Sequence, residues 1–333
     1  MKRFITIIIL LLFIPTFSGC GNSNENTYDY DETPPGVLVV GYVQVGAESA
    51  WRLANTASFM YAFGHSSRFD FRFVDSQNNP ALQQAAVYDF IAQEVDYIII
   101  APIEEYGWDE ILLEAKNAGI KVIISDRMIE TTDESLYVFW VGADFLQEGI
   151  DAMDWLNNYL VTIGRENELL NVFHMQGTMG SSAQIGRTEG INRGIYENDN
   201  LVLKERETGD FTLERGAEVM NEWLGKYQTD EIDILIAEND DMAFGAIRAM
   251  EEAGIKPGQD IIIISFDAGR NAVQAVADGL INATVECNPL HGPRVRENIE
   301  LLEAGVIPQK RQYVHTGMIF DARNAAIEVE NRW

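Results

Sequence analysis

The chain of 333 residues contains 52 acidic and 24 basic residues, and its formal net charge is −28. A protein this acidic is a poor partner for nucleic acid, because phosphate binding needs basic patches. The length suits two domains of ordinary size, each with a hydrophobic core of its own.

The N-terminal residues have the pattern of an export signal. Lys2 and Arg3 precede an apolar run, residues 4–14, of about ten residues where about twenty are needed to span a bilayer. The sequence Phe-Ser-Gly-Cys that ends at Cys20 resembles a bacterial lipobox. We therefore expect a lipoprotein signal peptide over residues 1–20, with Cys20 lipidated. The protein would then be secreted and anchored to the outer face of the bacterial cytoplasmic membrane, or periplasmic. An ordinary signal peptide with an incidental cysteine is the alternative.

A polar segment follows the signal. Residues 21–36 are rich in Asn, Asp, Glu, Ser and Thr, and they predict a flexible tether because they have almost nothing to bury. The only other cysteine is Cys287, with which a lipidated Cys20 could not pair. The folded part is therefore expected to lack a disulfide and to depend on its core.

From Val37 onward, short apolar runs alternate with segments of helical spacing, two of which end in glycine at Gly119 and Gly254. Continuous β-branched runs suit strands buried on both faces, as in a parallel sheet covered by helices. There are more such units than one sheet needs, which predicts an α/β protein with two doubly wound parallel-sheet domains. The predicted strands include Val37–Val43, Phe69–Val74, Tyr97–Ile100, Val122–Ile124, Val172–Met175, Ile232–Ala237, Ile261–Phe266 and Ala283–Val285.

The residues that follow these runs are unusually polar. In open parallel sheets, ligands bind outside the carboxyl ends of the strands. Carboxylate, carboxamide and guanidinium groups can each engage two neighbouring sugar hydroxyls, and an aromatic ring can cover the apolar face of a sugar. The polar and aromatic residues at these strand ends therefore predict a selective carbohydrate site rather than a lipid or peptide site. Its members are Glu48, Trp51, Arg52, Asp126, Arg127, Arg187, Glu238, Asn239, Asp240, Asp241 and Asp267.

Several of these residues also fit simpler roles. Asp240 and Ser182 are more typical of helix N-caps than of ligand contacts. Asp126 and Arg127 could equally form a surface ion-pair network, and Trp51 could equally belong to the core. A phosphate site in the glycine-rich loop after Met175 is disfavoured, because the loop lacks the Lys-Ser/Thr ending of a P-loop.

Six segments, taken in their order along the chain, resemble the ribose- and galactose-type periplasmic binding proteins, which have the type I solute-binding fold. The resemblance extends from Val37 onward, and two further segments, Gln44–Thr56 and Ile99–Ile120, are most similar to galactofuranose-binding members that serve ABC transporters. The six segments are Asp75–Pro80 (DSQNNP), Ser125–Arg127 (SDR), Met175–Gly190 (MQGTMGSSAQIGRTEG), Gly209–Thr212 (GDFT), Glu238–Ala246 (ENDDMAFGA) and Ser265–Gly269 (SFDAG).

The resemblance implies a monomer without cofactor or metal that closes on a monosaccharide and delivers it to the permease of an ABC transporter. It implies three crossovers near Gly142, Cys287 and Thr316 that act as a hinge. The lobes so implied are residues 37–142 with 288–316, and residues 143–287 with 317–333. The implied sugar contacts are Glu48, Trp51, Arg52, Asp126, Arg127, Arg187, Phe211, Asn239, Asp241 and Asp267.

Two differences from ribose-type members bear on the sugar. Cys287 stands where those proteins carry Gln, and Trp51 and Arg52 replace their paired aromatic residues. The resemblance therefore implies a hexose such as galactose or galactofuranose, in pyranose or furanose form, rather than ribose.

The other classes of function are enzymes, transcriptional regulators and sensory receptors. The sequence has no Gly-x-Ser-x-Gly elbow and no His-Glu-x-x-His motif, and its four histidines lack metal-ligand spacing, so we do not expect an enzyme. Lac-repressor-type regulators share the sensor fold, but they need a basic helix-turn-helix and carry no export signal. A receptor that presents a sugar or a furanosyl signal to a membrane sensor kinase or chemoreceptor stays open.

Overall fold

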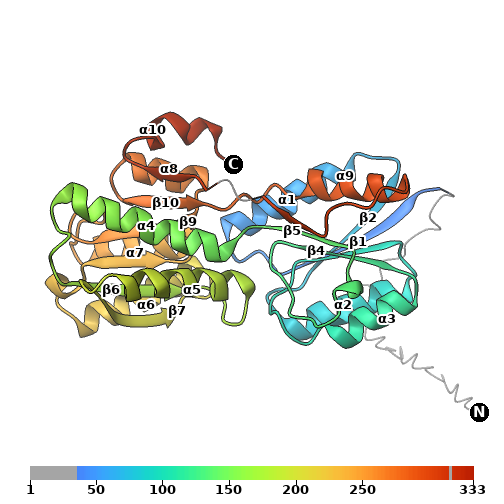
Figure 1. The fold of residues 1–333 in the computed structure, drawn as a ribbon, viewed down its shortest axis with the longest axis horizontal. Helices are drawn as coiled ribbons and strands as arrows, with labels where there is room; N and C mark the ends of the chain where they lie inside the picture. Colours follow the sequence, from blue (N-terminus) through green and yellow to red (C-terminus); the bar gives the residue numbers. More distant parts are fainter. Residues whose placement is uncertain (1–35, 315–316) are drawn as a thin grey trace, which may run out of the picture. The chain divides into compact units, whose positions relative to one another are not determined.

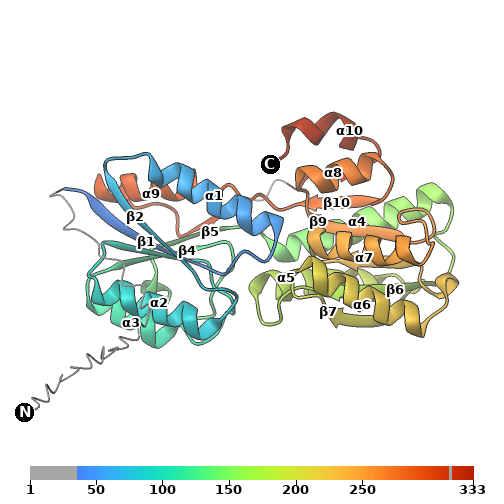
Figure 2. The ribbon, with the colours of Figure 1, turned by 180° about the vertical axis from the view of Figure 1, so that it is seen from behind.

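The computed structural model describes residues 36–314 and 317–333 (Figure 1). The expected signal peptide, Cys20, nearly all of the tether and Thr316 lie outside these residues. Two six-stranded sheets, each covered by helices on both faces, confirm the predicted α/β class with two doubly wound domains (Figures 1 and 2). Within the described ranges, no helix combines the length and apolarity that a membrane span requires.

The first sheet has the strand order β11-β5-β4-β3-β1-β2, and all its strands are parallel. We call this sheet and its helices the N-lobe. Helices α1 and α9 cover one face, and α2 and α3 cover the other. The elements are β1 (Leu38–Gln44), α1 (Ala50–Gly64), β2 (Phe69–Asp75), α2 (Pro80–Ala92), β3 (Tyr97–Ile100), α3 (Asp109–Asn117), β4 (Lys121–Ser125), the 3₁₀ turn η1 (Glu134–Leu136), β5 (Phe139–Gly142), α9 (Gly292–Glu303) and β11 (Arg311–Tyr313).

The second sheet has the order β12-β10-β9-β8-β6-β7, and only β12 is antiparallel to its neighbour. We call this sheet and its helices the C-lobe. Helices α4 and α5 cover one face, and α6, α7 and α8 cover the other. The elements are α4 (Phe145–Ile163), β6 (Leu170–Gln176), α5 (Ser182–Glu197), β7 (Leu201–Thr208), α6 (Leu213–Lys226), η2 (Thr229–Glu231), β8 (Ile234–Ala237), α7 (Asp240–Glu252), β9 (Ile262–Asp267), α8 (Arg270–Ala277), β10 (Ala283–Glu286), β12 (Ile319–Asp321), α10 (Ala325–Glu328) and η3 (Val329–Asn331).

The apolar runs are continuous because alternate residues of each central strand enter different cores. In β3, Ile98 and Ile100 pack with α2 and α3, whereas Tyr97 and Ile99 pack with α1 and α9. Successive side chains of a strand point to opposite faces, so a strand covered on both sides needs an apolar residue at every position. Each such buried side chain contributes about 1.5–3 kcal/mol.

The chain passes between the two lobes three times. The passages lie between β5 and α4, between β10 and α9, and between β11 and β12. The first follows Gly142, and the second follows Glu286, the last residue of β10.

The two predicted N-caps are wrong by one residue. The cap of α7 is Asn239, whose side chain accepts the N–H of Met242, and the cap of α5 is Ser181, which accepts the N–H of Gln184. Asp240 instead turns into the C-lobe, where its carboxylate accepts from Ser265 Oγ at 2.6 Å and from the Thr284 hydroxyl at 2.9 Å. Ser182 binds a residue of the N-lobe.

Candidate functional site

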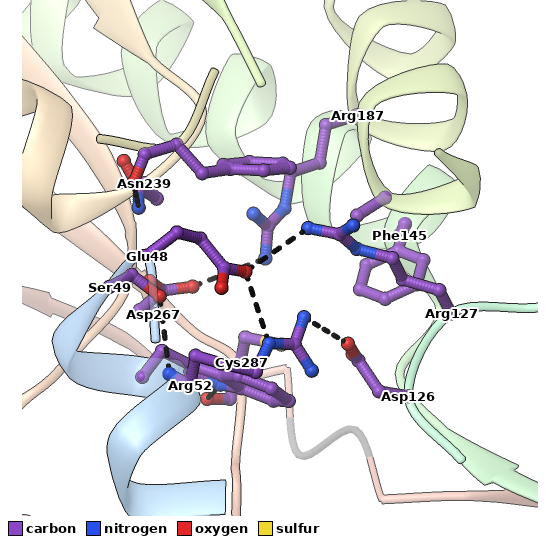
Figure 3. Close-up of a pocket in the computed structure, with 13 residues that line it drawn as sticks. Glu48, Ser49, Arg52, Asp126, Arg127, Phe145, Arg187, Asn239, Asp267 and Cys287 are labelled. Atoms are coloured by element: carbon purple, nitrogen blue, oxygen red, sulfur yellow. Dashed lines mark hydrogen bonds and ion pairs between the residues drawn. The ribbon is translucent and has the colours of Figure 1, made fainter. Parts of the chain in front are cut away.

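A pocket with about 300 Å³ of empty space lies where strand ends of both lobes meet (Figure 3). Every predicted contact residue except Asp241 lines it. Asp241 is turned toward helix α1, where its carboxylate accepts the N–H of Ala50 at 3.0 Å. The lining residues are Glu48, Ser49, Trp51, Arg52, Asp126, Arg127, Phe145, Ala183, Arg187, Phe211, Asn239, Asp267 and Cys287.

The N-lobe wall of the pocket is a chain of four charged side chains. Arg52 Nη2 lies 2.8 Å from Asp126 Oδ2, and Arg52 Nε lies 3.1 Å from Glu48 Oε1. Arg127 Nη2 lies 3.6 Å from the same Glu48 oxygen, and its Nη1 donates to the carbonyl of Ile103. None of the four side chains is more than 6% exposed, so the alternative of a surface ion-pair network is wrong.

Two features of this wall suit a ligand with hydroxyl groups. Glu48 Oε2 is buried and has no hydrogen-bond partner among the described residues. A buried carboxylate oxygen without a donor costs free energy until a donor arrives. Burial, together with the charge of Arg52, lowers the pKa of Arg127 to about 10, so Arg127 still carries a positive charge at neutral pH.

The C-lobe wall is organised around Arg187 on α5. Its Nε lies 2.9 Å from Glu148 Oε2 and its Nη2 lies 3.4 Å from Asp267 Oδ1, while Nη1 donates to the carbonyl of Glu238. Burial raises the pKa of Asp267 well above its usual value, and the guanidinium of Arg187 opposes that rise. Arg187 therefore links Glu148, outside the pocket, to Asp267 in its lining.

Aromatic rings complete the lining. Trp51 belongs to a hydrophobic core cluster and also lines the pocket, so both roles considered for it are correct. Its Nε1 donates to the carbonyl of Cys287 at 2.8 Å. The guanidinium of Arg127 lies 5.2 Å from the centroid of the Phe211 ring, and that of Arg52 lies 4.8 Å from Trp51.

The backbone is strained at the pocket. Asp126, Phe211 and Asp267 have φ angles of 64°, 60° and 104°. A residue with a side chain pays roughly 1–2 kcal/mol in the left-handed region, and such strain is concentrated at functional sites. At Gly177, a Cβ would lie 1.9 Å from the Phe211 ring, so only glycine allows the ring its place.

Sequence reasoning missed three lining residues, Ser49, Phe145 and Ala183, and it did not name Cys287 as a contact. Phe145 opens α4 just after the end of β5. Had the short run Phe139–Gly142 been recognised as a strand, the rule that ligands bind beyond strand ends would have led to Phe145. Burial raises the pKa of the Cys287 thiol, which is therefore protonated at neutral pH.

His291 supports Trp51 from behind the pocket. The two rings meet edge to face with centroids 5.7 Å apart, and Ser125 Oγ lies 3.2 Å from His291 Nδ1. Burial lowers the pKa of His291 to about 4.

This shift predicts a loss of stability in acid. Between about pH 6.5 and 4 the unfolded chain holds a proton on this imidazole and the folded chain does not, so stability falls as the pH drops through this window. We expect wild type to lose about 3 kcal/mol relative to His291→Gln between pH 7 and 4. Chemical unfolding at several pH values measures this difference. Asp240, whose pKa burial raises to about 7, has the opposite effect on stability, but it is present in both proteins and its effect cancels when they are compared. Parallel pH curves for the two proteins would contradict the prediction.

The lining holds equal numbers of guanidinium and carboxyl groups. Arg52, Arg127 and Arg187 face Glu48, Asp126 and Asp267. A strongly charged ligand would leave one sign of charge unpaired in a buried site, which is costly. Such a pocket suits a neutral ligand that both donates and accepts hydrogen bonds. Among the described residues, no cluster of three His, Cys, Asp or Glu side chains could hold a metal ion.

Comparison with known proteins agrees with this chemistry. The sequence matches the periplasmic binding protein domain over residues 48–291. It is 38% identical over 275 residues to the galactofuranose-binding protein YtfQ of Escherichia coli K12, which covers 82% of this chain and 85% of YtfQ.

Two solved structures are similar over most of their length. One is a Mycobacterium smegmatis protein in complex with β-D-fucofuranose, with a TM-score of 0.83, 39% identity and coverage of 89% of this chain and 95% of that one. The other is the periplasmic binding protein component of the arabinose ABC transporter from Shewanella sp. ANA-3, bound to α- and β-L-arabinofuranose (TM-score 0.82, 38% identity, 88% and 95% coverage). The chain therefore belongs to the periplasmic binding protein domain family, and it is a binding protein and not an enzyme.

Proposed function

We propose that the pocket binds a neutral monosaccharide in the furanose form and that the protein delivers it to the permease of an ABC importer. The observation that carries this proposal is the ring of three guanidinium and three carboxyl groups, in which Glu48 Oε2 is buried without a donor. A sugar hydroxyl supplies that donor and also accepts from a neighbouring guanidinium such as Arg127.

The relatives support a particular stereochemistry. Three of the relatives are described as binding galactofuranose, fucofuranose and arabinofuranose, respectively. D-galactose, D-fucose and L-arabinose share the configuration of their second, third and fourth carbons and differ only in the exocyclic end. We propose that this chain recognises the shared furanose ring, and that a hexose such as galactofuranose is its ligand. Ribose, with a different configuration, is disfavoured.

Transport is preferred to sensing because the arabinose-binding relative is a component of an ABC transporter. A receptor that feeds a sensor kinase remains the alternative. The chain is similar to the fructose-binding domain of a hybrid two-component system at 22% identity, a level that speaks for the fold alone. Deletion of the gene for this protein decides between them, since uptake of the sugar is lost only if the protein serves transport.

We propose that binding closes the two lobes about the three crossovers. The moving bodies are residues 37–142 with 288–316 and residues 143–287 with 317–333, in a monomer. Ligand that touches both lobes selects the closed form, because only that form makes all the contacts.

We further propose that lipidated Cys20 anchors the protein outside the cytoplasmic membrane. Cys20→Ser should then move the protein from the membrane fraction to the soluble fraction, and an unchanged distribution would contradict the anchor.

Gly177→Ala is expected to weaken sugar binding about tenfold. The added methyl group collides with the Phe211 ring, so the ring must leave its position over the pocket, and overpacking of this kind costs about 1–3 kcal/mol. Calorimetry on the variant measures the affinity. Gly225→Ala in α6 is the control, because its Cβ meets nothing within 4 Å. Equal affinity in the Gly177 variant would show that Phe211 does not contact the sugar.

Thermal unfolding against a panel of sugars tests the proposal. Specific binding to the folded state raises the midpoint by an amount set by ligand concentration over dissociation constant. D-galactose, D-fucose and L-arabinose should raise it, and D-glucose, D-ribose and myo-inositol should not.

The ring form is tested with locked analogues that are no larger than the sugar itself. 1,4-Anhydrogalactitol has the furanose ring and 1,5-anhydrogalactitol has the pyranose ring. The proposal expects a shift with the first alone, whereas a shift with the second alone would overturn the furanose assignment. No shift with any compound, in a protein shown to be folded and free of ligand, would overturn the sugar assignment.

A further inference from the structure

Two side chains of the C-lobe that do not line the pocket bind backbone N–H groups of the N-lobe. Asp241 Oδ2 accepts the N–H of Ala50 at 3.0 Å, and Ser182 Oγ accepts the N–H of Met128 at 2.7 Å. The residues of these pairs are 191 and 54 positions apart in the sequence. A backbone bond from Glu105 to the carbonyl of Gly180 accompanies them at 3.1 Å.

Both pairs lie directly beside the pocket residues of the N-lobe. Ala50 opens α1 and precedes Trp51 and Arg52, and Met128 follows Arg127. A change in the distance between the lobes that breaks these two bonds must therefore also move the N-lobe wall of the pocket away from the C-lobe wall.

The bond to Ala50 has a clear physical basis. The first N–H groups of a helix have no partner within the helix, and the N-terminus carries a partial positive charge that favours a carboxylate. Ser49 accepts the N–H of Arg52 from within the N-lobe. Asp241 satisfies a second of these groups from the other lobe, and it can do so only when the lobes are together.

Ser182 has a comparable position in α5. It is the first residue of that helix, and Ser181 before it already provides the cap. The hydroxyl of Ser182 is therefore free to accept from Met128, and at 9% exposure the residue is shielded from competing water.

We propose that Asp241 and Ser182 are positioning residues that raise sugar affinity without touching the sugar, by stabilising the closed arrangement of the lobes. This inference rests on the proposed function. When the lobes separate, both bonds are exchanged for bonds to water. The net free energy of the two bonds therefore stabilises the closed state and not the open state. Because ligand selects the closed form, any free energy that stabilises closure lowers the apparent dissociation constant by the corresponding factor.

The test compares Asp241→Ala, Ser182→Ala and the double variant with wild type, using the purified protein and the panel sugar that binds best. Each single variant should bind about fivefold more weakly, and the two factors should multiply if the bonds act separately. The loss should appear as faster dissociation with little change in association rate. The order of preference among the sugars should stay the same, because no contact with the sugar has changed.

Conservative variants and a matched control separate this role from a merely structural one. Asp241→Asn and Ser182→Thr keep an acceptor oxygen and should restore affinity. Asp260→Ala removes a carboxylate that accepts the N–H of Lys256 at 2.8 Å within the C-lobe, so it should leave affinity unchanged. The thermal midpoint without ligand should be the same for wild type and the two single variants.

The outcomes are distinct. Wild-type affinity in the double variant would overturn this inference and leave the proposed function standing. A weaker affinity accompanied by a lower midpoint without ligand and no rescue by Asn or Thr would also overturn it, because it indicates damage to the fold. Failure of wild type to bind any sugar would overturn the proposed function itself.

Discussion

Arg127→Ala is expected to weaken sugar binding at least about a hundredfold while leaving the fold intact. Arg127 is 2% exposed, and its guanidinium lies at the pocket with Glu48 at 3.6 Å and the centroid of the Phe211 ring at 5.2 Å. Hydrogen bonds from a charged donor contribute about 1.5–3 kcal/mol each, and a guanidinium can engage two hydroxyls. The fold should survive because Glu48 keeps its closer partner Arg52 at 3.1 Å.

Calorimetry on the variant measures the loss, and thermal unfolding without ligand checks the fold. Arg127→Lys keeps the charge but loses the planar fork, so it should bind with intermediate affinity. Arg296→Ala is the control, because Arg296 pairs with Glu300 on α9 away from the pocket. Undiminished binding by Arg127→Ala would show that the guanidinium does not contact the sugar.

Arg187→Leu is expected to lower the free energy of unfolding of the C-lobe by about 3–5 kcal/mol, because a buried ion pair that loses one partner leaves an uncompensated charge. Here Glu148 and Asp267 both lose the guanidinium, and Glu238 loses a donor to its carbonyl. The thermal midpoint should fall by about 10 °C. The destabilisation should shrink in acid, where the two carboxyl groups can take up protons.

Arg193→Leu is a matched control on the same helix. Arg193 and its partner Glu189 are about half exposed, at 51% and 52%, and such surface pairs contribute little to stability. Its midpoint should stay within a degree or two of wild type. Equal stability of the two variants would show that Arg187 does not compensate the buried carboxyl groups around it.

The strand ends could be predicted from sequence because parallel strands place their carboxyl ends at one edge of each sheet. This rule alone led to Asp126, Arg127, Asn239 and Asp267, all of which line the pocket. Asp241 follows the same strand as Asn239 but lies outside the pocket lining, because successive helical residues point in different directions. Asn239 faces the pocket, Asp240 turns inward to Ser265, and Asp241 turns to α1.

The edge strands β7, β11 and β12 were missed for a different reason. Strand β7 carries the run Lys204–Glu207, because an edge strand is covered less completely and needs no continuous apolar sequence. Contacts between segments far apart in the chain were also beyond reach. Nothing in the local pattern of α4 indicates that Glu148 pairs with Arg187, 39 residues later.

The most direct test of the central claim is a calorimetric titration of the purified protein, freed of bound ligand by unfolding and refolding, with D-galactose, D-fucose and L-arabinose. We expect one site per chain for at least one of these sugars, with a negative heat-capacity change as the pocket closes and binding lost in Arg127→Ala. Absence of heat with all three sugars, in protein whose refolding is verified by its unfolding transition, would contradict the claim that this pocket is a furanose-binding site.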